Sequence, residues 1–256
     1  MAFNLNNFVI DRVLRAVGMS KDDSILFAIN QVTNPSLNVT SETAEAVDAL
    51  GTPIAIFNRA KTCEFSAENA IFDMDLMAVQ AGSSKQVADA DAVIAVPMFE
   101  ILEGSALSKT PVDGAVKFYA LNNDGSLGEA LALSADAGTD GGIVVDGLNI
   151  SGLPEGVQVM AVYEYNANGE EKNGAVSVIN SATEFPKACK LVLEILGCDV
   201  CNQEELIYAY LILPNFKISP DFDWSIATDG THPFSGQAMQ DYCDPNQVLY
   251  QLIIAE

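Results

Sequence analysis

Residues Val47–Ser84 read VDALGTPIAIFNRAKTCEFSAENAIFDMDLMAVQAGSS, and this stretch decides the fold. Its first part predicts a β-hairpin, because Ala49–Gly51 can form a turn in which the glycine adopts a positive φ. Pro53 cannot donate a hydrogen bond to a strand ladder, which suits the first residue of a strand. Ile54 and Ile56 then extend the second strand. We therefore predict two antiparallel strands joined by this turn.

The second part of the stretch predicts an amphipathic helix over residues Glu68–Ala81. Ser66 offers a side-chain oxygen for the N-cap, and the charge of Glu68 suits the first turn of a helix. Gly82 stands where a left-handed C-cap is expected. Apolar residues recur at spacings of three and four, at Ile71, Met74, Met77, Ala78 and Ala81. The stretch has a well-defined local structure and carries no obvious nucleophile, no phosphate loop and no metal cluster.

The rest of the chain has the pattern of strands separated by turns. Asn123-Asp124-Gly125 lies between two alternating runs and predicts a hairpin, and QVLYQLIIAE at the end predicts a last strand. This pattern favours a mainly β fold, a sandwich or barrel with one flanking helix. We predict one domain over residues 1–256. Within it, residues 110–182 are a candidate inserted β subdomain, bracketed by Thr110-Pro111 and Phe185-Pro186.

The charge of the chain argues against nucleic-acid recognition. Acidic residues number 35 against 12 basic ones, which gives a formal net charge of −23. Such a surface repels nucleic acid and anionic membranes, although acidic excess also serves simple solubility. The start, MAFNLNNFVIDRVLRA, lacks the pattern of a signal peptide, and no apolar run reaches about 18 residues. We expect a protein made in a cytosol, with no membrane partner.

The five cysteines leave three interpretations open. Reduced thiols are expected in a chain without an export signal. The alternatives depend on CDVC, in which Cys198 and Cys201 form the one close pair, with Cys189 and Cys243 further away. A structural zinc site usually has two close pairs, so zinc is disfavoured. A disulfide between Cys198 and Cys201, or between subunits, is the other alternative.

The sequence offers no convincing catalytic or metal site. The single histidine, His232, lies between Thr231 and Pro233 and is expected on the surface rather than as a catalytic base. Nucleophile-elbow and nucleotide-binding motifs are missing from the sequence. Asp221, Asp223 and Asp229 are spaced unlike the ligands of a calcium-binding EF-hand. We therefore predict no enzyme activity, no cofactor and no metal.

Several motifs follow one another in an informative order. The hairpin around VDALGTPI leads through NRAKTCEFSAEN into a helix that ends at QAGS. The strands GVQVMAVYEY, EFPKACKLVLEI and ELIYAYLILPNFKIS follow, and QVLYQLIIAE ends the chain. This order resembles the tail tube proteins of long-tailed bacteriophages over most of the chain, and residues 110–182 fit least well.

The resemblance implies a β-sandwich flanked by one helix, here Glu68–Ala81. It also implies a homo-hexameric ring in which inner strands close into a central β-barrel, with rings stacked head to tail. In this family a long hairpin and the N-terminal arm, here Met1–Val9, commonly join stacked rings. The candidate inter-ring residues are Asp48, Ala49, Leu50, Gly51, Thr52 and Pro53. Cys63, between hairpin and helix, is the first thiol to test for a bridge between subunits.

The function implied is that of a structural virion protein of the tail, assembled in the cytoplasm of the host bacterium. Its tube would conduct DNA from capsid to host without binding it specifically, and an acidic lumen would repel phosphate. The implied partners are further copies of the chain, the sheath or terminator, the baseplate or tip, and the tape measure protein. The main alternative is another virion protein, such as a head decoration or head–tail adaptor protein. A cell-surface β-sandwich and an enzyme are the remaining alternatives.

Overall fold

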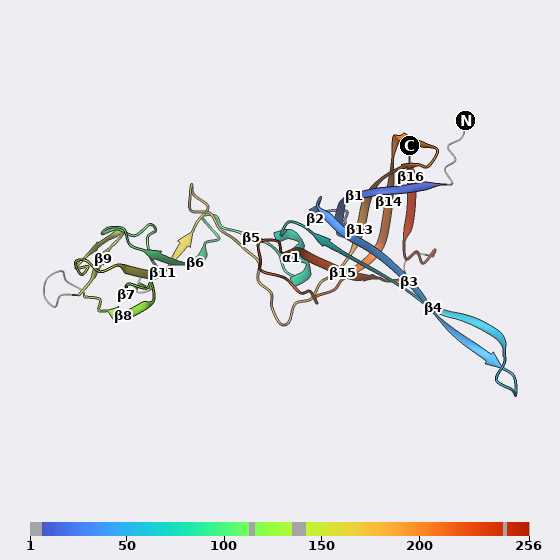
Figure 1. Cartoon of the computed structure of the whole chain (residues 1–256), viewed down its shortest axis with the longest axis horizontal. Coiled ribbons are helices and arrows are strands. Elements are labelled where there is room, and N and C mark those ends of the chain that lie inside the picture. The colour runs from blue at the N-terminus through green and yellow to red at the C-terminus, as the bar shows by residue number, and fades with distance from the viewer. Residues whose placement is uncertain (1–6, 113–115, 135–141, 243–244, 256) are drawn as a thin grey trace. The chain divides into compact units, whose positions relative to one another are not determined.

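The described part of the protein is mainly β, with antiparallel sheets and one short helix, as predicted (Figure 1). This computed structural model describes residues 7–112, 116–134, 142–242 and 245–255. The chain divides into two compact units. Unit 1 combines the residues up to Lys85 with those from Val178 onward, and unit 2 spans Gln86–Ser177.

Unit 1 is built on one antiparallel sheet in the order β2-β1-β13-β14-β15-β4-β3, with β16 also paired to β14. Its strands are β1 (Phe8–Met19), β2 (Ile25–Ile29), β3 (Val32–Val47), β4 (Pro53–Asn69), β13 (Ala188–Asp199), β14 (Asn202–Ile218), β15 (His232–Ala238) and β16 (Gln251–Ala255). β3 and β4 run out together as a long hairpin beyond the rest of this sheet (Figure 1). The predicted hairpin strands are therefore confirmed.

The sheet curls around its own core. Phe27 of β2 and Phe234 of β15 make an edge-on ring contact with centroids 6.4 Å apart, although three strands separate β2 from β15 in the sheet order. On β13 alternate side chains enter this core, among them Leu191 and Leu193. Such alternation is what a strand with one buried face requires. Each strand of the curled sheet therefore has one face toward the core and one face away from it, and we call the second the outer face.

Helix α1 (Met74–Ala81) is shorter than predicted. Asp73, not Ser66, is its N-cap, and the Oδ1 of Asp73 accepts a hydrogen bond from the Leu76 amide at 2.7 Å. Ser66 instead lies in β4, where it pairs with β3 on one side and β15 on the other. The helix ends at Gly82 with φ 70°, as predicted. Leu76 is fully buried against the core, whereas the expected core residue Ile71 is exposed.

Unit 2 has its own sheet and its own core. The sheet order is β6-β11-β7-β8, and two small pairs, β9–β10 and β5–β12, complete the unit. The strands are β5 (Gln86–Val87), β6 (Ile94–Ile101), β7 (Lys117–Leu121), β8 (Leu127–Leu131), β9 (Val144–Asp146), β10 (Asn149–Ser151), β11 (Val159–Ala167) and β12 (Val176–Ser177). The predicted turn between β7 and β8 is confirmed, with Gly125 at φ 79°. Phe118 and Tyr163 are among the residues buried in this core.

Candidate assembly surfaces

The turn between β3 and β4 is held in one conformation by Asp48. Its Oδ1 accepts hydrogen bonds from the Leu50 amide at 2.8 Å and the Thr52 amide at 2.9 Å. The Gly51 amide donates to the Asp48 carbonyl at 3.1 Å, and Gly51 has φ 84°. The glycine turn predicted from the sequence is therefore confirmed. The tip of the hairpin is therefore a hydrogen-bonded turn.

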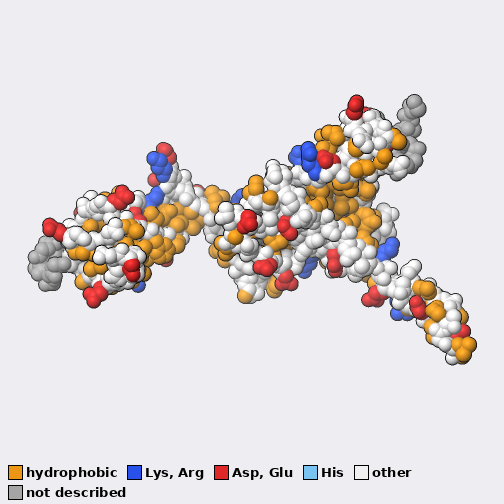
Figure 2. Space-filling model, in the orientation of Figure 1, with side chains coloured by type: hydrophobic (Ala, Val, Ile, Leu, Met, Phe, Trp, Pro, Cys, Tyr) orange, Lys and Arg blue, Asp and Glu red, His pale blue; other side chains and the backbone are white. Residues whose placement is uncertain are grey.

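This hairpin exposes apolar side chains on both of its faces. Leu50 at the tip is 91% exposed, and Ile56 and Phe57 are adjacent on β4 and so point to opposite faces. Val47 and Ile54 are exposed as well. Figure 2 shows apolar side chains on the surface of the projecting hairpin. Contiguous exposed apolar surface usually marks an interaction site, so the six tip residues Asp48–Pro53 remain inter-ring candidates.

Toward the tip of the hairpin, neither edge has a further strand partner among the described residues. β3 is the last strand of the sheet, and β15 pairs with β4 only over Cys63–Asn69. Beyond the pair of Thr40 and Thr62, the hairpin is therefore a two-stranded ribbon within the described chain. An isolated two-stranded hairpin is at best marginally stable in water. No further strand of unit 1 pairs with this ribbon within the described residues.

Two further strand edges are open on the opposite part of unit 1. β1 pairs with β2 only over Ala16–Met19, so its edge from Phe8 to Arg15 has no partner on that side among the described residues. β16 pairs with β14 alone. β1 and β16 flank β13 and β14, so these four strands form a sheet segment open at both edges. Sequence reasoning did not identify these edges, because edge position depends on which strands pair.

The outer face of this four-stranded segment carries cations that are paired with carboxylates. Arg15 of β1 is bonded to Glu194 of β13, which is its direct cross-strand neighbour. Arg12 pairs with Asp11 at 3.0 Å. Lys190 pairs at 3.5 Å with Asp23 in the turn after β1. Within each of these three pairs the two charges cancel.

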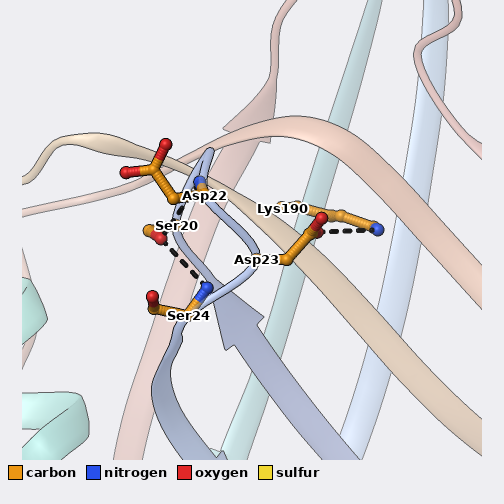
Figure 3. A network of polar contacts seen from close by, with 5 residues as sticks. All are labelled: Ser20, Asp22, Asp23, Ser24 and Lys190. Atoms are coloured by element: carbon orange, nitrogen blue, oxygen red, sulfur yellow. Dashed lines mark hydrogen bonds and ion pairs between the residues drawn. The ribbon is translucent and has the colours of Figure 1, made fainter.

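Figure 3 shows how the turn between β1 and β2 presents Asp23 to Lys190. The Ser20 hydroxyl accepts hydrogen bonds from the amides of Asp22 at 3.3 Å and Ser24 at 3.2 Å. Asp23 takes a positive φ of 57°, a conformation that aspartate tolerates better than most residues. The turn therefore fixes one carboxylate beside the lysine at the end of the four-stranded segment.

His232 is buried, so the prediction of a surface histidine is wrong. It is 1% exposed at the start of β15. Its Nδ1 accepts a hydrogen bond from the Asp73 amide at 3.3 Å, and its Nε2 lies 2.8 Å from the Oε1 of Gln80. The ring also stacks on Phe72 at 4.8 Å. Burial lowers the pKa of His232, and the nearby Asp73 carboxylate opposes that effect in part. The side chain of His232 thus supports helix α1. Its hydrogen bonds and ring contacts among the described residues are with Phe72, Asp73, Gln80 and Phe222, and none of these is a serine or cysteine nucleophile.

The cysteines lie in different environments. Cys63 is fully buried in the core, and burial raises the pKa of its thiol. This position argues against the expected bridge from Cys63 to another subunit. Burial raises the pKa of the Cys189 thiol to about 11. Cys198 is half-buried and Cys201 exposed, and both thiols are free here, so the disulfide between them stays a prediction. Cys243 lies outside the described residues.

Metal binding finds no support in the described part of the chain. No group of three or more His, Cys, Asp or Glu side chains is placed there to hold an ion. Asp221, Asp223 and Asp229 therefore do not form such a group. None of the helices among these residues is long and apolar enough to cross a membrane.

Comparison with known proteins gives one clear match. The model of the YomU/Tube protein family matches residues 8–251, which is nearly the whole chain. A search of curated proteins finds no match.

Proposed function

Because the chain belongs to the YomU/Tube protein family, a family of phage tail tube proteins, we propose that it assembles into stacked hexameric rings that form the tube of a phage tail. Members of this family are structural proteins and not enzymes. The coarse function, a structural protein of the phage tail, follows from membership. The proposal concerns the number of subunits in a ring, the contacts between subunits and the passage of DNA through the tube.

The observation that carries the proposal is the pair of open edges on β1 and β16. Each copy offers a four-stranded segment with one free edge of β1 and one of β16. Pairing β1 of one copy with β16 of the next extends the sheet from copy to copy. A contact of this kind is heterologous, and it closes into a ring when the rotation per copy divides a full turn. Closure also removes edges that would otherwise invite aggregation.

In this arrangement the hairpin tip Asp48–Pro53 reaches a neighbouring ring. Its support is the exposed Leu50 and the absence of a covering element for the ribbon within the described chain. The N-terminal arm is assigned to the same contact, and its residues Met1–Asn6 lie outside the described part. The other proposed partners are the sheath or terminator, the baseplate or tip, and the tape measure protein. The protein would be assembled in the host bacterial cytoplasm and reside in the virion tail.

The outer face of β1, β13, β14 and β16 is proposed to line the lumen. Its cations are neutralised by carboxylates, as in the pair of Arg15 and Glu194. The composition predicts an acidic lumen, whereas the ion pairs on this face favour a wall with less excess negative charge. Paired cations bind phosphate weakly, because the carboxylate already occupies the guanidinium or ammonium group. DNA would then pass without specific binding.

Negative-stain microscopy of concentrated protein tests the proposal. Hollow tubes or six-fold rings of uniform diameter are expected, and dispersed monomers at every concentration would refute assembly. Hydrogen exchange locates the contact. On assembly the amides of Val9–Val13 and Leu252–Ile254 that point to the open edges should become protected, while those near Leu193 in β13 are already protected in the monomer. Unchanged exchange at both edges would rule out the β1–β16 pairing.

A further inference from the structure

The projecting hairpin separates its charges by strand. No Lys or Arg occurs between Val32 and Asp48, where β3 carries Glu42 and Glu45. No Asp or Glu occurs between Pro53 and Thr62, where β4 carries Arg59 and Lys61. The whole chain has only 12 basic residues, so two between Pro53 and Thr62 is a concentration. The ribbon therefore has an acidic edge strand and a basic edge strand.

These four charges have no ion-pair partner within the described chain. Glu42 and Glu45 face no cation within salt-bridge distance, and the same holds for Arg59 and Lys61 toward carboxylates. The backbone edges beside them are equally unpaired, since β15 ends its pairing with β4 at Cys63. Each edge thus offers both hydrogen-bonding groups and a single sign of charge.

Charges on an edge strand can serve only to prevent aggregation. That role needs charge of either sign on both edges, and a mixture would serve equally well. It does not account for acids on one strand and bases on the other. Attraction across the hairpin's own ladder accounts for it only in part: Glu42 lies in the bulge opposite Arg59, but Glu45 faces Ile56. The apolar side chains on both faces, such as Ile56 and Phe57, also indicate that the ribbon is covered in the assembled protein.

We propose that hairpins of adjacent copies lie edge to edge, with β3 of one hairpin beside β4 of the next. The partner is a second copy of this chain, because one hairpin supplies both halves of the complementary pair. In each copy, Glu42 and Glu45 then face one neighbour, and Arg59 and Lys61 face the other. The contact is heterologous and repeats around a ring. It rests on the proposed ring assembly and adds to it a second, charged contact outside the β1–β16 edges.

Charge reversal tests this pairing in the full chain. One variant carries Glu42→Lys and Glu45→Lys, and a second carries Arg59→Glu and Lys61→Glu. In each, both edges of the hairpin have the same sign, so like charges meet at the contact. We expect the protein concentration needed for tube formation to rise at least about tenfold in either variant, and the defect to lessen at high salt.

Two combinations then identify the partner. A variant with all four substitutions exchanges the signs of the two edges and should assemble like the wild type. An equal mixture of the two double variants should also form tubes, because acidic hairpins can alternate with basic ones around a six-membered ring. Glu129→Lys with Asp146→Lys, two exposed positions in unit 2, is the matched control and should assemble normally. Circular dichroism of each monomer confirms that it is folded.

The outcomes separate the two claims. If the wild type forms no rings or tubes, the ring assembly fails and the edge pairing falls with it. If the wild type and both double variants assemble equally well, only the edge pairing is refuted, and the charges merely protect the edges. If the double variants fail and neither the four-fold variant nor the mixture recovers, the charges face another surface and the pairing is again refuted.

Discussion

The Nε2 of His232 lies 2.8 Å from the Oε1 of Gln80, and this contact joins strand β15 to helix α1. On its other side the ring accepts a hydrogen bond from the amide of Asp73, so Nδ1 carries no proton. The Nε2 of His232 therefore carries the proton and donates a hydrogen bond to the Oε1 of Gln80. The Nε2 of Gln80 in turn donates a hydrogen bond to the Pro233 carbonyl at 3.0 Å. The helix is thus held to the sheet by a buried neutral histidine.

This arrangement predicts that stability falls as the pH is lowered. The pKa of His232 is below its ordinary value of 6.5, so the unfolded chain takes up a proton first. Stability is therefore complete above that ordinary value and decreases as the pH falls toward the lowered pKa. Urea unfolding between about pH 7.5 and pH 5.5 should show a smaller pH dependence for His232→Gln than for the wild type. Because the chain has one histidine, equal dependences would contradict the prediction.

The capping role of Asp73 predicts a modest loss of stability on its removal. Asp73→Ala deletes the acceptor for the Leu76 amide and should lower the free energy of unfolding by about 1 kcal/mol. Ser66→Ala is the matched control, because Ser66 lies in β4 rather than at the helix start. Its effect should stay within about 0.5 kcal/mol in the same denaturant titration. A larger effect from Ser66 than from Asp73 would contradict this assignment.

Leu50 should matter for assembly and not for folding. Its side chain is 91% exposed, so Leu50→Ser should change the free energy of unfolding by less than about 0.5 kcal/mol. Tube formation should nevertheless require more protein, because the tip loses its apolar contact. The contrasting variant is Leu191→Ala, which removes a fully buried side chain and should cost about 2–5 kcal/mol. Normal tubes from Leu50→Ser would exclude the tip from the inter-ring contact.

Unit 2 should be removable as an inserted domain. β5 pairs with β12, so the chain enters and leaves this unit at neighbouring positions. Replacing residues 86–177 with a short Gly/Ser linker should leave unit 1 folded, with a cooperative unfolding transition followed by circular dichroism. Deleting residues 110–182 is the control and should impair folding, because β6 loses its partner β11. Loss of folding in the first deletion would contradict the prediction.

The features predicted correctly from the sequence are those fixed by neighbouring residues. The turn at Asp48–Thr52 and the hairpin turn at Gly125 depend on a few adjacent residues and on a positive φ that glycine permits. The same holds for the end of helix α1 at Gly82. The order of such elements also carried the resemblance to tail tube proteins, and membership of the family followed.

Other features were decided by residues far apart in the chain. Ser66 has the chemistry of an N-cap, yet pairing with β3 and β15 keeps it in a strand, and the helix begins at Met74 instead. His232 looked like a surface residue until the fold placed it against Phe72 and Gln80. Local signals cannot report such contacts, because the energy of strand pairing and burial depends on partners that only the tertiary structure brings together.

The same distinction applies to the assembly surfaces. The sequence alone determined the hairpin, its turn and the separation of the acidic residues within Val32–Asp48 from the basic residues within Pro53–Thr62. Only the tertiary structure decided that this hairpin extends past β15, and that β1 and β16 keep free edges. An edge is defined by the absence of a neighbouring strand, and which strands become neighbours follows from how the whole sheet curls around its core.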